Sequence, residues 1–408
     1  MFKHLAIFAL LTLVLSSCSS TSSVYSTKRS AQMLAENTDI KDIVDNIAMA
    51  EINSKHCAGV VVGIVTPEGE QYYSYGLKDV EKNEPMPTDA LFQIGSITKI
   101  FTSSLLLKLD QEKIISINDP ISKLFPPDFH PVTKGLGDLT FARLSSHSSA
   151  LPAEHQSIVM IKNAVGFLWT GHNIWDTFNE QMMWDFFGQW EFGNLESTKY
   201  KYSNTAYIFL GNLLGQAIPG KDYETLLFDK ILTPMKITDL GFDLTAEQRA
   251  KVATGYSGDA PIFMRAHQYM EPWEIQKGLR SAGSLYAGAR GLAKFLKVNM
   301  QIDKDTTGFD FTEAHKRRVK SIYNGHVGLG WFIETLPVSR REFIYANGII
   351  SGYTSFIGFD DNAKVGVVVL QNAMNMKNEV GRHLLDRLVY NFNKGLGFHI
   401  PGIKSVRE

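Results

Sequence analysis

The sequence predicts a mixed α/β protein of the α+β type, in which an antiparallel sheet formed by both termini is flanked by helices. Two observations carry this prediction. A helix pattern followed by a hairpin pattern stands near the N-terminus, and a hairpin pattern followed by a helix pattern stands near the C-terminus. The region between them, about 91–332, is expected to be an all-helical insertion with long loops. Any functional site would then lie in the cleft between these two parts.

The N-terminal elements follow from the spacing of apolar residues. Residues 39–54 carry isoleucine and valine at helical spacing, which predicts an amphipathic helix. Residues 58–66 form an apolar run that is typical of a buried strand. Pro67-Glu68-Gly69-Glu70 is a turn signal, so residues 71–76 are expected to return as the second strand of a hairpin.

The C-terminal elements complete the sheet. Strands are predicted at 341–349, 354–360 and 365–372, and an amphipathic helix is predicted over about 377–393. We therefore expect residues 39–395 to form one domain, followed by a C-terminal tail at 396–408.

Composition excludes several classes of protein. The chain has 408 residues, of which 44% are hydrophobic and 20% charged, so it is not disordered. Lys and Arg number 41 against 42 Asp and Glu, which argues against a nucleic-acid binder. Two cysteines are too few for a disulfide framework or a thiolate zinc site. The histidines show no metal-binding motif and no glycine-rich phosphate loop occurs, so neither a metal nor a cofactor is predicted.

The first cysteine belongs to a targeting segment. A positive start is followed by an apolar run from Leu5 to Leu15 and then by Ser16-Ser17-Cys18, which has the form of a secretory signal. The end of this segment resembles the lipobox of bacterial lipoproteins. The resemblance implies that residues 1–17 are removed, that Cys18 is lipidated, and that 18–38 is a flexible tether. It places the domain in the periplasm, anchored to a cell-envelope membrane, which we expect to be the outer membrane. An ordinary signal with an incidental cysteine is the alternative; Cys57 is expected to be a buried core residue.

A candidate nucleophile stands at the start of an apolar helix. Ser96 and Lys99 are three residues apart just before the apolar segment 100–109, so they would share one face of a helix. A serine hydroxyl is a weak nucleophile until a base takes its proton, and a desolvated lysine can be that base. The alternative for an isolated match is a helix cap with a solvated lysine.

A second motif, Tyr202-Ser203-Asn204, precedes the apolar segment 206–214. A phenol near a serine and a lysine can relay a proton to a leaving group, and Asn204 can orient a lysine amine or a substrate carbonyl. A turn that caps a helix is the alternative interpretation.

With these motifs in place, the chain from about 39 to 393 resembles the class C β-lactamase and D-alanyl-D-alanine carboxypeptidase family of serine hydrolases. Further segments carry the likeness: Leu144–Pro152, Trp190, Ala282–Tyr286, Gly328–Trp331 and Gly366–Asn372. The resemblance implies the β-lactamase/transpeptidase-like fold. It makes Ser96 the acylated nucleophile, Lys99 its base partner and Tyr202 the general acid or base, with Asn204 positioning substrate.

The third family motif is broken. Aligning Gly348 puts Ala346 where the family has a lysine or histidine that helps to hold a substrate carboxylate. By the resemblance, Asn347, Gly348 and Ile349 line the substrate site, and the amide of Ile349 or Ile350 is available as an oxyanion donor. Arg280 is a candidate replacement cation; a solvated surface arginine is the alternative.

These observations leave three functional hypotheses. The first is a hydrolase that acylates Ser96 with peptidoglycan stem peptides or β-lactams, as a carboxypeptidase or β-lactamase does. The second is an esterase on the same fold, and the third is a catalytically weak or inactive envelope binding protein; both are motivated by Ala346. Of the remaining features, His147 is expected to be structural, and the aromatic-rich segment 154–192 is expected to pack as helical core rather than to form a lid. No oligomeric state is predicted.

Overall fold

A computed structural model describes residues 39–302, 308–322 and 324–393 of the chain. The predicted signal peptide, Cys18, the tether and the C-terminal tail lie outside these residues. None of the helices in the described ranges is long and apolar enough to cross a membrane.

The described residues form a mixed α/β fold built on a nine-stranded sheet, which confirms the predicted fold class. The strand order is β3-β2-β1-β13-β12-β11-β10-β9-β8, and every neighbouring pair is antiparallel. The strands are β1 Gly59–Thr66, β2 Gly69–Asp79, β3 Glu84–Pro85, β8 Val319–Lys320, β9 His326–Val327, β10 Phe332–Thr335, β11 Glu342–Ile350, β12 Tyr353–Asp360 and β13 Val365–Gln371.

Both ends of the chain meet in the middle of this sheet. Strand β1 pairs with β13 over six residues, with Val62 opposite Val369. The two predicted hairpins are therefore joined edge to edge into one sheet, as the sequence indicates. The observed strands agree with the predicted ones to within a few residues because both β1 and β13 are continuous buried apolar runs.

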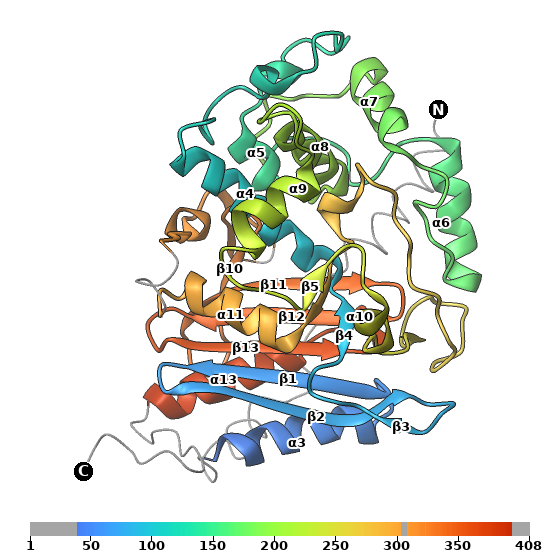
Figure 1. Ribbon diagram of the computed structural model, residues 1–408, viewed down its shortest axis with the longest axis vertical. Coiled ribbons are helices and arrows are strands. Elements are labelled where there is room, and N and C mark those ends of the chain that lie inside the picture. Colours follow the sequence, from blue (N-terminus) through green and yellow to red (C-terminus); the bar gives the residue numbers. More distant parts are fainter. Residues whose placement is uncertain (1–38, 303–307, 323, 394–408) are drawn as a thin grey trace.

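Helices cover the two faces of the sheet (Figure 1). The terminal helices α3 (Ile40–Asn53) and α13 (Val380–Asn393) pack together and share one apolar cluster with Val60 and Val62 of β1. Val61 faces the other way, into the cluster that contains residues of α11 (Ala289–Asn299) and of the helical part. This alternation is the side-chain period of two that a strand imposes.

The inserted part lies above the sheet in Figure 1 and is mostly helical. Its α-helices are α4 Thr98–Gln111, α5 Phe141–Ser145, α6 Ile158–Thr170, α7 Glu180–Gln189, α8 Asn204–Gly215, α9 Tyr223–Leu227 and α10 Ala246–Ala250. Short helical turns are η1 Gly95–Ile97, η2 Ile121–Leu124, η3 Leu136–Asp138, η4 Phe228–Leu232, η5 Arg280–Ala282 and η6 Thr312–His315.

The expectation of an all-helical region over 91–332 is wrong in detail. This region also contains a small sheet of β4 (Leu91–Gln93), β7 (Tyr286–Gly288) and β5 (Leu240–Gly241), and it contributes β8 and β9 to the large sheet. In addition, β6 (Tyr256–Ser257) pairs with β14 (Ala373–Met374). Each of these strands has only two or three residues, too few for an alternating pattern to be recognised in a sequence.

The aromatic-rich segment 154–192 packs mainly as core, as predicted. Phe178 and Phe187 are fully buried, and the Phe187 ring stacks on Phe209 of α8 at 4.0 Å between centroids. Trp169 at the end of α6 departs from this pattern, because it is 56% exposed and stacks on the exposed Phe263. The segment thus packs against α8, whose N-terminus carries part of the candidate site.

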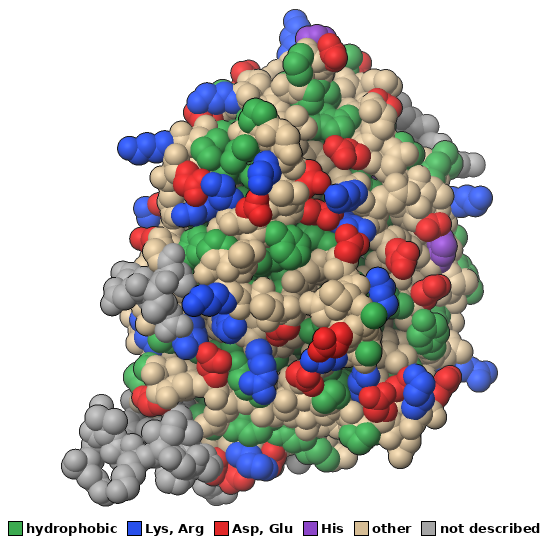
Figure 2. Space-filling view, in the orientation of Figure 1, with side chains coloured by type: hydrophobic (Ala, Val, Ile, Leu, Met, Phe, Trp, Pro, Cys, Tyr) green, Lys and Arg blue, Asp and Glu red, His purple; other side chains and the backbone are tan. Residues whose placement is uncertain are grey.

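On the face of the molecule seen in Figure 2, charged side chains are spread rather than gathered. Basic and acidic side chains alternate on this face, as the nearly equal numbers of the two kinds would suggest. Cys57 is buried at 2% exposure, which agrees with its predicted place in the core, and burial raises the pKa of its thiol to about 12.

Candidate active site

Ser96 lies where the helical part meets the sheet, in the short helical turn η1 that connects β4 to α4. The preceding residue, Gly95, has φ of +51°, and a Cβ atom there would lie 2.8 Å from the backbone nitrogen of Ile349. A side chain at position 95 would therefore push η1 away from β11. Glycine allows the backbone at Ser96 to lie directly against this strand.

Lys99 stands in the first turn of α4 and is 2% exposed. Its Nζ lies 3.0 Å from Ser96 Oγ and donates to the carbonyl oxygen of Ala282 at 2.6 Å. The three-residue spacing thus brings amine and hydroxyl into contact, as predicted. The solvated lysine of the alternative interpretation does not occur.

Tyr202 reaches the same hydroxyl from the loop before α8. Its Oη donates to Ser96 Oγ at 2.7 Å, and Lys99 Nζ lies 5.1 Å from the centroid of its ring. The next residue, Ser203, caps α8 by accepting from the amide of Ala206 at 2.9 Å, which fixes the backbone that carries Tyr202. Ser96, Lys99 and Tyr202 are called the Ser96 cluster below.

His147 packs against Tyr202 and bonds the backbone next to it. Its Nδ1 accepts a hydrogen bond from the amide of Ser203 at 3.2 Å, and its ring lies 4.4 Å from the ring of Tyr202. Burial, and secondarily the charge of Lys99, hold the pKa of His147 well below its usual range, so the imidazole is neutral. These contacts are those of a structural residue, in line with the sequence-based interpretation.

Asn204 is the first residue of α8, and its side chain leads to a group that the sequence analysis missed. Its Nδ2 donates to Glu154 Oε1 at 2.6 Å. Glu154 is 7% exposed and lies two residues beyond Pro152, at the end of a family-like segment. Its closeness to this segment is the one feature of the sequence that could have drawn attention to Glu154. The contact between residues 154 and 204 cannot be recognised from the sequence.

Strand β11 forms the opposite wall of the site. Its pairing with β10 ends at Tyr345, so beyond this residue β11 has a strand neighbour, β12, on one side only. The other edge faces η1: a Cβ atom on Gly348 would lie 1.8 Å from the carbonyl oxygen of Ile94. The backbone of Ile349 therefore lies beside Gly95 and Ser96, where an amide could stabilise an oxyanion.

The side chains of β11 alternate between the two faces of the strand. Ala346 is 3% exposed and belongs to the apolar cluster of the helical part, whereas Asn347 lies on the other face, opposite Phe356. Asn347 Oδ1 is buried without a hydrogen-bond partner among the described residues. The strand thus supplies backbone to the site, and the side chain at position 346, where the sequence resemblance leads us to expect a cation, is a methyl group.

Arg280, the candidate replacement cation, is engaged by partners of its own. Its Nε donates to the carbonyl oxygen of Ile275 at 2.7 Å, and its Nη1 pairs with Asp243 at 3.0 Å and with Glu224 at 3.4 Å. Two carboxylates hold the guanidinium at the first residue of η5, whereas the last residue of η5, Ala282, is the one whose carbonyl accepts from Lys99. The sequence gives no hint of these partners, which are 37 and 56 residues away.

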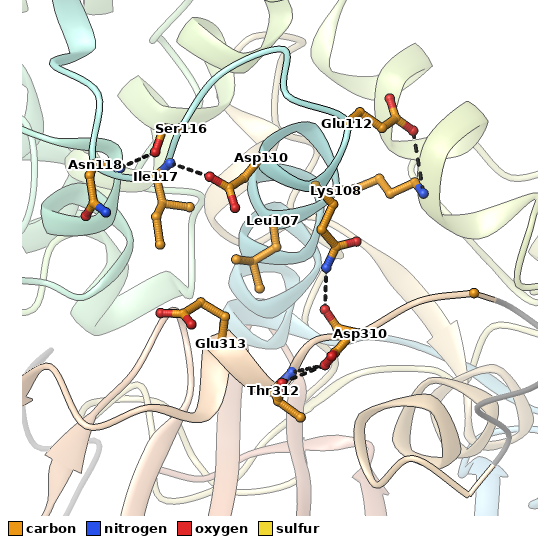
Figure 3. A pocket seen from close by; sticks show the side chains of 12 residues that line it. Leu107, Lys108, Asp110, Glu112, Ser116, Ile117, Asn118, Asp310, Thr312 and Glu313 are labelled. Carbon is orange, nitrogen blue, oxygen red and sulfur yellow. Dashed lines mark hydrogen bonds and ion pairs between the residues drawn. The ribbon is translucent and has the colours of Figure 1, made fainter.

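A cavity of about 720 Å³ lies at the other end of α4, around Lys108, Asp110 and Asp310 (Figure 3). At 1.5 Å per residue, the 14 residues of α4 separate it from Ser96 by roughly 20 Å. Its acidic groups are engaged, since Asp110 accepts from the amide of Ile117 and Asp310 from the amide of Thr312. It is not the place of the chemistry. Within the described ranges, no three His, Cys, Asp or Glu side chains gather as metal ligands would.

A mixed α/β fold with a serine, a buried lysine and a tyrosine in mutual contact defines a class of serine hydrolases. The chain belongs to the Beta-lactamase family, whose model matches residues 38–391. This membership covers the whole described domain and supports a serine hydrolase.

Individual relatives agree with the family. The chain is 26% identical over 350 residues to the D-alanyl-D-alanine-carboxypeptidase/endopeptidase AmpH of Escherichia coli, covering 83% of this chain and 86% of that protein. It is 20% identical to a beta-lactamase of Yersinia enterocolitica, covering 84% and 89% of the two chains. The crystal structure of a class C beta lactamase from Rhodobacter sphaeroides superposes with a TM-score of 0.69 at 18% identity, covering 86% and 99%, and so shares the fold.

Proposed function

We propose that this protein hydrolyses peptidoglycan-type peptides or β-lactams through an acyl-enzyme on Ser96, as a D-alanyl-D-alanine carboxypeptidase or a β-lactamase does. One observation carries the proposal: Ser96 Oγ lies within hydrogen-bond distance of both Lys99 Nζ and Tyr202 Oη. The names of the relatives from Escherichia coli and Yersinia enterocolitica, a carboxypeptidase/endopeptidase and a beta-lactamase, support this substrate class.

The geometry suggests how acylation would proceed. Once the Lys99 ammonium has lost a proton, Ser96 Oγ attacks the substrate carbonyl carbon while its own proton passes to the neutral Lys99 Nζ, 3.0 Å away. The carbonyl oxygen takes the negative charge, and the amides of Ser96 and Ile349 are placed to donate to it. As the bond to the leaving group breaks, Tyr202 Oη gives a proton to the departing nitrogen or oxygen. Water then cleaves the ester on Ser96: the water gives one proton to the Tyr202 phenolate, and Ser96 Oγ recovers its proton from Lys99 Nζ.

Ala346 favours a second candidate, an esterase on the same fold. Without a cation at this position, and with Arg280 held by Glu224 and Asp243, a substrate carboxylate lacks its usual partner in the family. An uncharged ester or amide suits such a site better than a free peptide C-terminus. If turnover of every substrate class were negligible, the third hypothesis, an envelope binding protein, would remain.

The test is covalent labelling of Ser96. The protein is incubated with a fluorescent penicillin and with an activated neutral ester, and each adduct is read by intact mass and located by peptide mapping. We expect an adduct on Ser96 that disappears in Ser96→Ala and persists in the control Ser122→Ala, an exposed serine in η2. An adduct that survives Ser96→Ala, or none from either probe, would contradict the proposal. Faster labelling by the ester than by the penicillin would select the esterase.

The site of action is also a proposal. We infer from residues 1–18 that the mature chain is lipid-anchored through Cys18, with its domain in the periplasm and its anchor in the outer membrane. Mass spectrometry of the N-terminal peptide of the membrane fraction should find a diacylglyceryl-type modification on Cys18. Recovery of an unmodified Cys18, or of the protein in the soluble fraction, would contradict the anchor.

A further inference from the structure

A buried carboxyl group lies beside the Ser96 cluster, and the reaction outlined above does not use it. Glu154 Oε1 accepts from Asn204 Nδ2 at 2.6 Å. Its other oxygen, Oε2, is buried and has no hydrogen-bond partner among the described residues. A buried carboxyl group is costly unless it is well bonded. The protonation state of this carboxyl group should therefore be felt mainly by its hydrogen-bond partner, the Asn204 amide.

Few charges act on Glu154. Lys99, on α4, is the charged side chain whose field reaches it. His155 is neutral, because burial lowers its pKa to about 4, and its ring packs against Phe178 and Phe186. His147 is neutral for the same reason. Burial raises the pKa of Glu154 to about 7, although the Asn204 bond and the charge of Lys99 both act to lower it. The carboxyl group therefore gains or loses its proton near neutral pH.

The proton on Glu154 determines what it can offer to Asn204. A carboxylate only accepts hydrogen bonds, so it must face Nδ2, and the amide oxygen Oδ1 is then turned to the other side. There Oδ1 can accept from an ammonium group or from a substrate N–H. A protonated carboxyl group can instead donate its O–H to Oδ1. The amide can then turn over and present Nδ2 to a substrate carbonyl.

We propose, on the basis of the acyl-enzyme function above, that Glu154 is a positioning residue that sets which end of the Asn204 amide faces the substrate. Ionised Glu154 selects substrates that donate an N–H at this position. Protonated Glu154 admits substrates that offer only an acceptor there. Glu154 would thus make the choice of substrate depend on pH while remaining outside the bond-making steps.

The first test needs no turnover. Asn204→Asp replaces the amide with a carboxyl group, which can only accept hydrogen bonds when it is ionised. Once this new carboxyl group and Glu154 are both ionised, the two carboxylates should repel each other and destabilise the fold. We expect this variant to lower Tm more at pH 8 than at pH 5, by about 2 °C or more. Adding Glu154→Gln should restore Tm at pH 8, because the new amide can donate to the new carboxylate.

A matched control is Asn173→Asp, since Asn173 Nδ2 donates to the backbone carbonyl of Glu274 and not to a carboxyl group. Glu154→Gln should not rescue this control. A Tm loss in Asn204→Asp that is the same at both pH values, or that Glu154→Gln leaves unchanged, would overturn the proposal.

The second test reads specificity. Acylation of Ser96 is followed with two activated acyl probes that differ only in an N–H or an N-methyl group beside the reacting carbonyl. In the unaltered protein, the ratio of acylation rates should move about tenfold toward the N–H probe between pH 5.5 and pH 8.5. In Glu154→Gln the ratio should stay flat.

An equal pH dependence in Glu154→Gln would overturn the proposal. Absence of any Ser96 adduct would instead refute the proposed function. In that case the melting experiment still decides whether Glu154 orients Asn204.

Discussion

The two walls of the candidate site differ in what they contribute. The helical wall, made by η1, α4 and the loop before α8, brings the side chains of Ser96, Lys99 and Tyr202 into direct contact. The strand wall, made by β11 beyond Tyr345, supplies backbone, and the buried Ala346 stands where the sequence resemblance leads us to expect a cation. The groups that would make and break bonds are thus in contact, whereas β11 carries no basic side chain that could anchor a substrate carboxylate. This difference teaches that the chemistry and the choice of substrate can vary independently on one fold.

The largest expected effect comes from breaking the helical wall. Lys99→Met removes the group within 3.0 Å of Ser96 Oγ and should lower the rate of Ser96 acylation about 10²- to 10⁴-fold. Stopped-flow or gel-based labelling with an activated ester measures this rate. Because Lys99 also donates to the carbonyl of Ala282, circular dichroism and Tm should be recorded alongside. Acylation at an unchanged rate in a folded variant would exclude Lys99 as the base.

A smaller effect is expected from repairing the strand wall. Ala346→Lys restores a cation to β11 and should raise kcat/KM for substrates that carry a carboxylate about tenfold, because charge-assisted hydrogen bonds are strong. Neutral esters should be hydrolysed at nearly the same rate as before. Ala346→Met, of similar length without charge, is the matched control. Equal gains in the lysine and methionine variants would show that shape and not charge limits this wall.

A third prediction concerns pH and the support of Tyr202. The pKa of His147 is lower in the folded protein than the value of about 6.5 expected in the unfolded chain. The stability contribution of neutral His147 is therefore fully present above about pH 6.5 and is lost as the pH falls below it. His147→Gln, which can still accept from the amide of Ser203, should lose less stability than the unaltered protein between pH 7.5 and pH 5.5. Urea unfolding at both pH values measures this; equal losses would contradict it, and the exposed His130→Gln serves as control.

The smallest effect is expected for Arg280→Ala. If the guanidinium belongs to the ion pairs with Glu224 and Asp243, the ratio of kcat/KM values for carboxylate-bearing and neutral substrates should not change. Loss of the pair with the exposed Asp243 should lower the free energy of unfolding by about 1 kcal/mol or less, whereas loss of the pair with the largely buried Glu224 should cost more. A selective loss of activity toward carboxylate-bearing substrates would instead show that Arg280 helps to bind the substrate carboxylate.

Much of this arrangement could be predicted from the sequence, for physical reasons that differ between its parts. Continuous apolar runs mark β1 and β13, and the Ser96–Lys99 spacing by itself places both groups on one helical face. Tyr202 could be singled out as a candidate from its motif, but its contact with Ser96 could not be predicted from spacing, because it spans 106 residues. Glu154 could not be found at all, since its meaning depends on burial and on Asn204. The ion pairs of Arg280 could not be predicted because its acidic partners are distant in the chain.

The pairing of β1 with β13 has a consequence for how the protein folds. It joins residues such as Val62 and Val369, which are 307 positions apart, so the contact order of this sheet is high and its completion is expected to be slow. Strand β11 is connected to β1 in the sheet only through β12 and β13. The strand wall beside Gly95 can therefore form only after the C-terminal strands have been made and have paired with β1. A nascent chain that has emerged as far as Tyr202 would thus carry every reactive side chain and still lack a working site. Catalytic competence should therefore appear late in folding, after β1 has paired with β13.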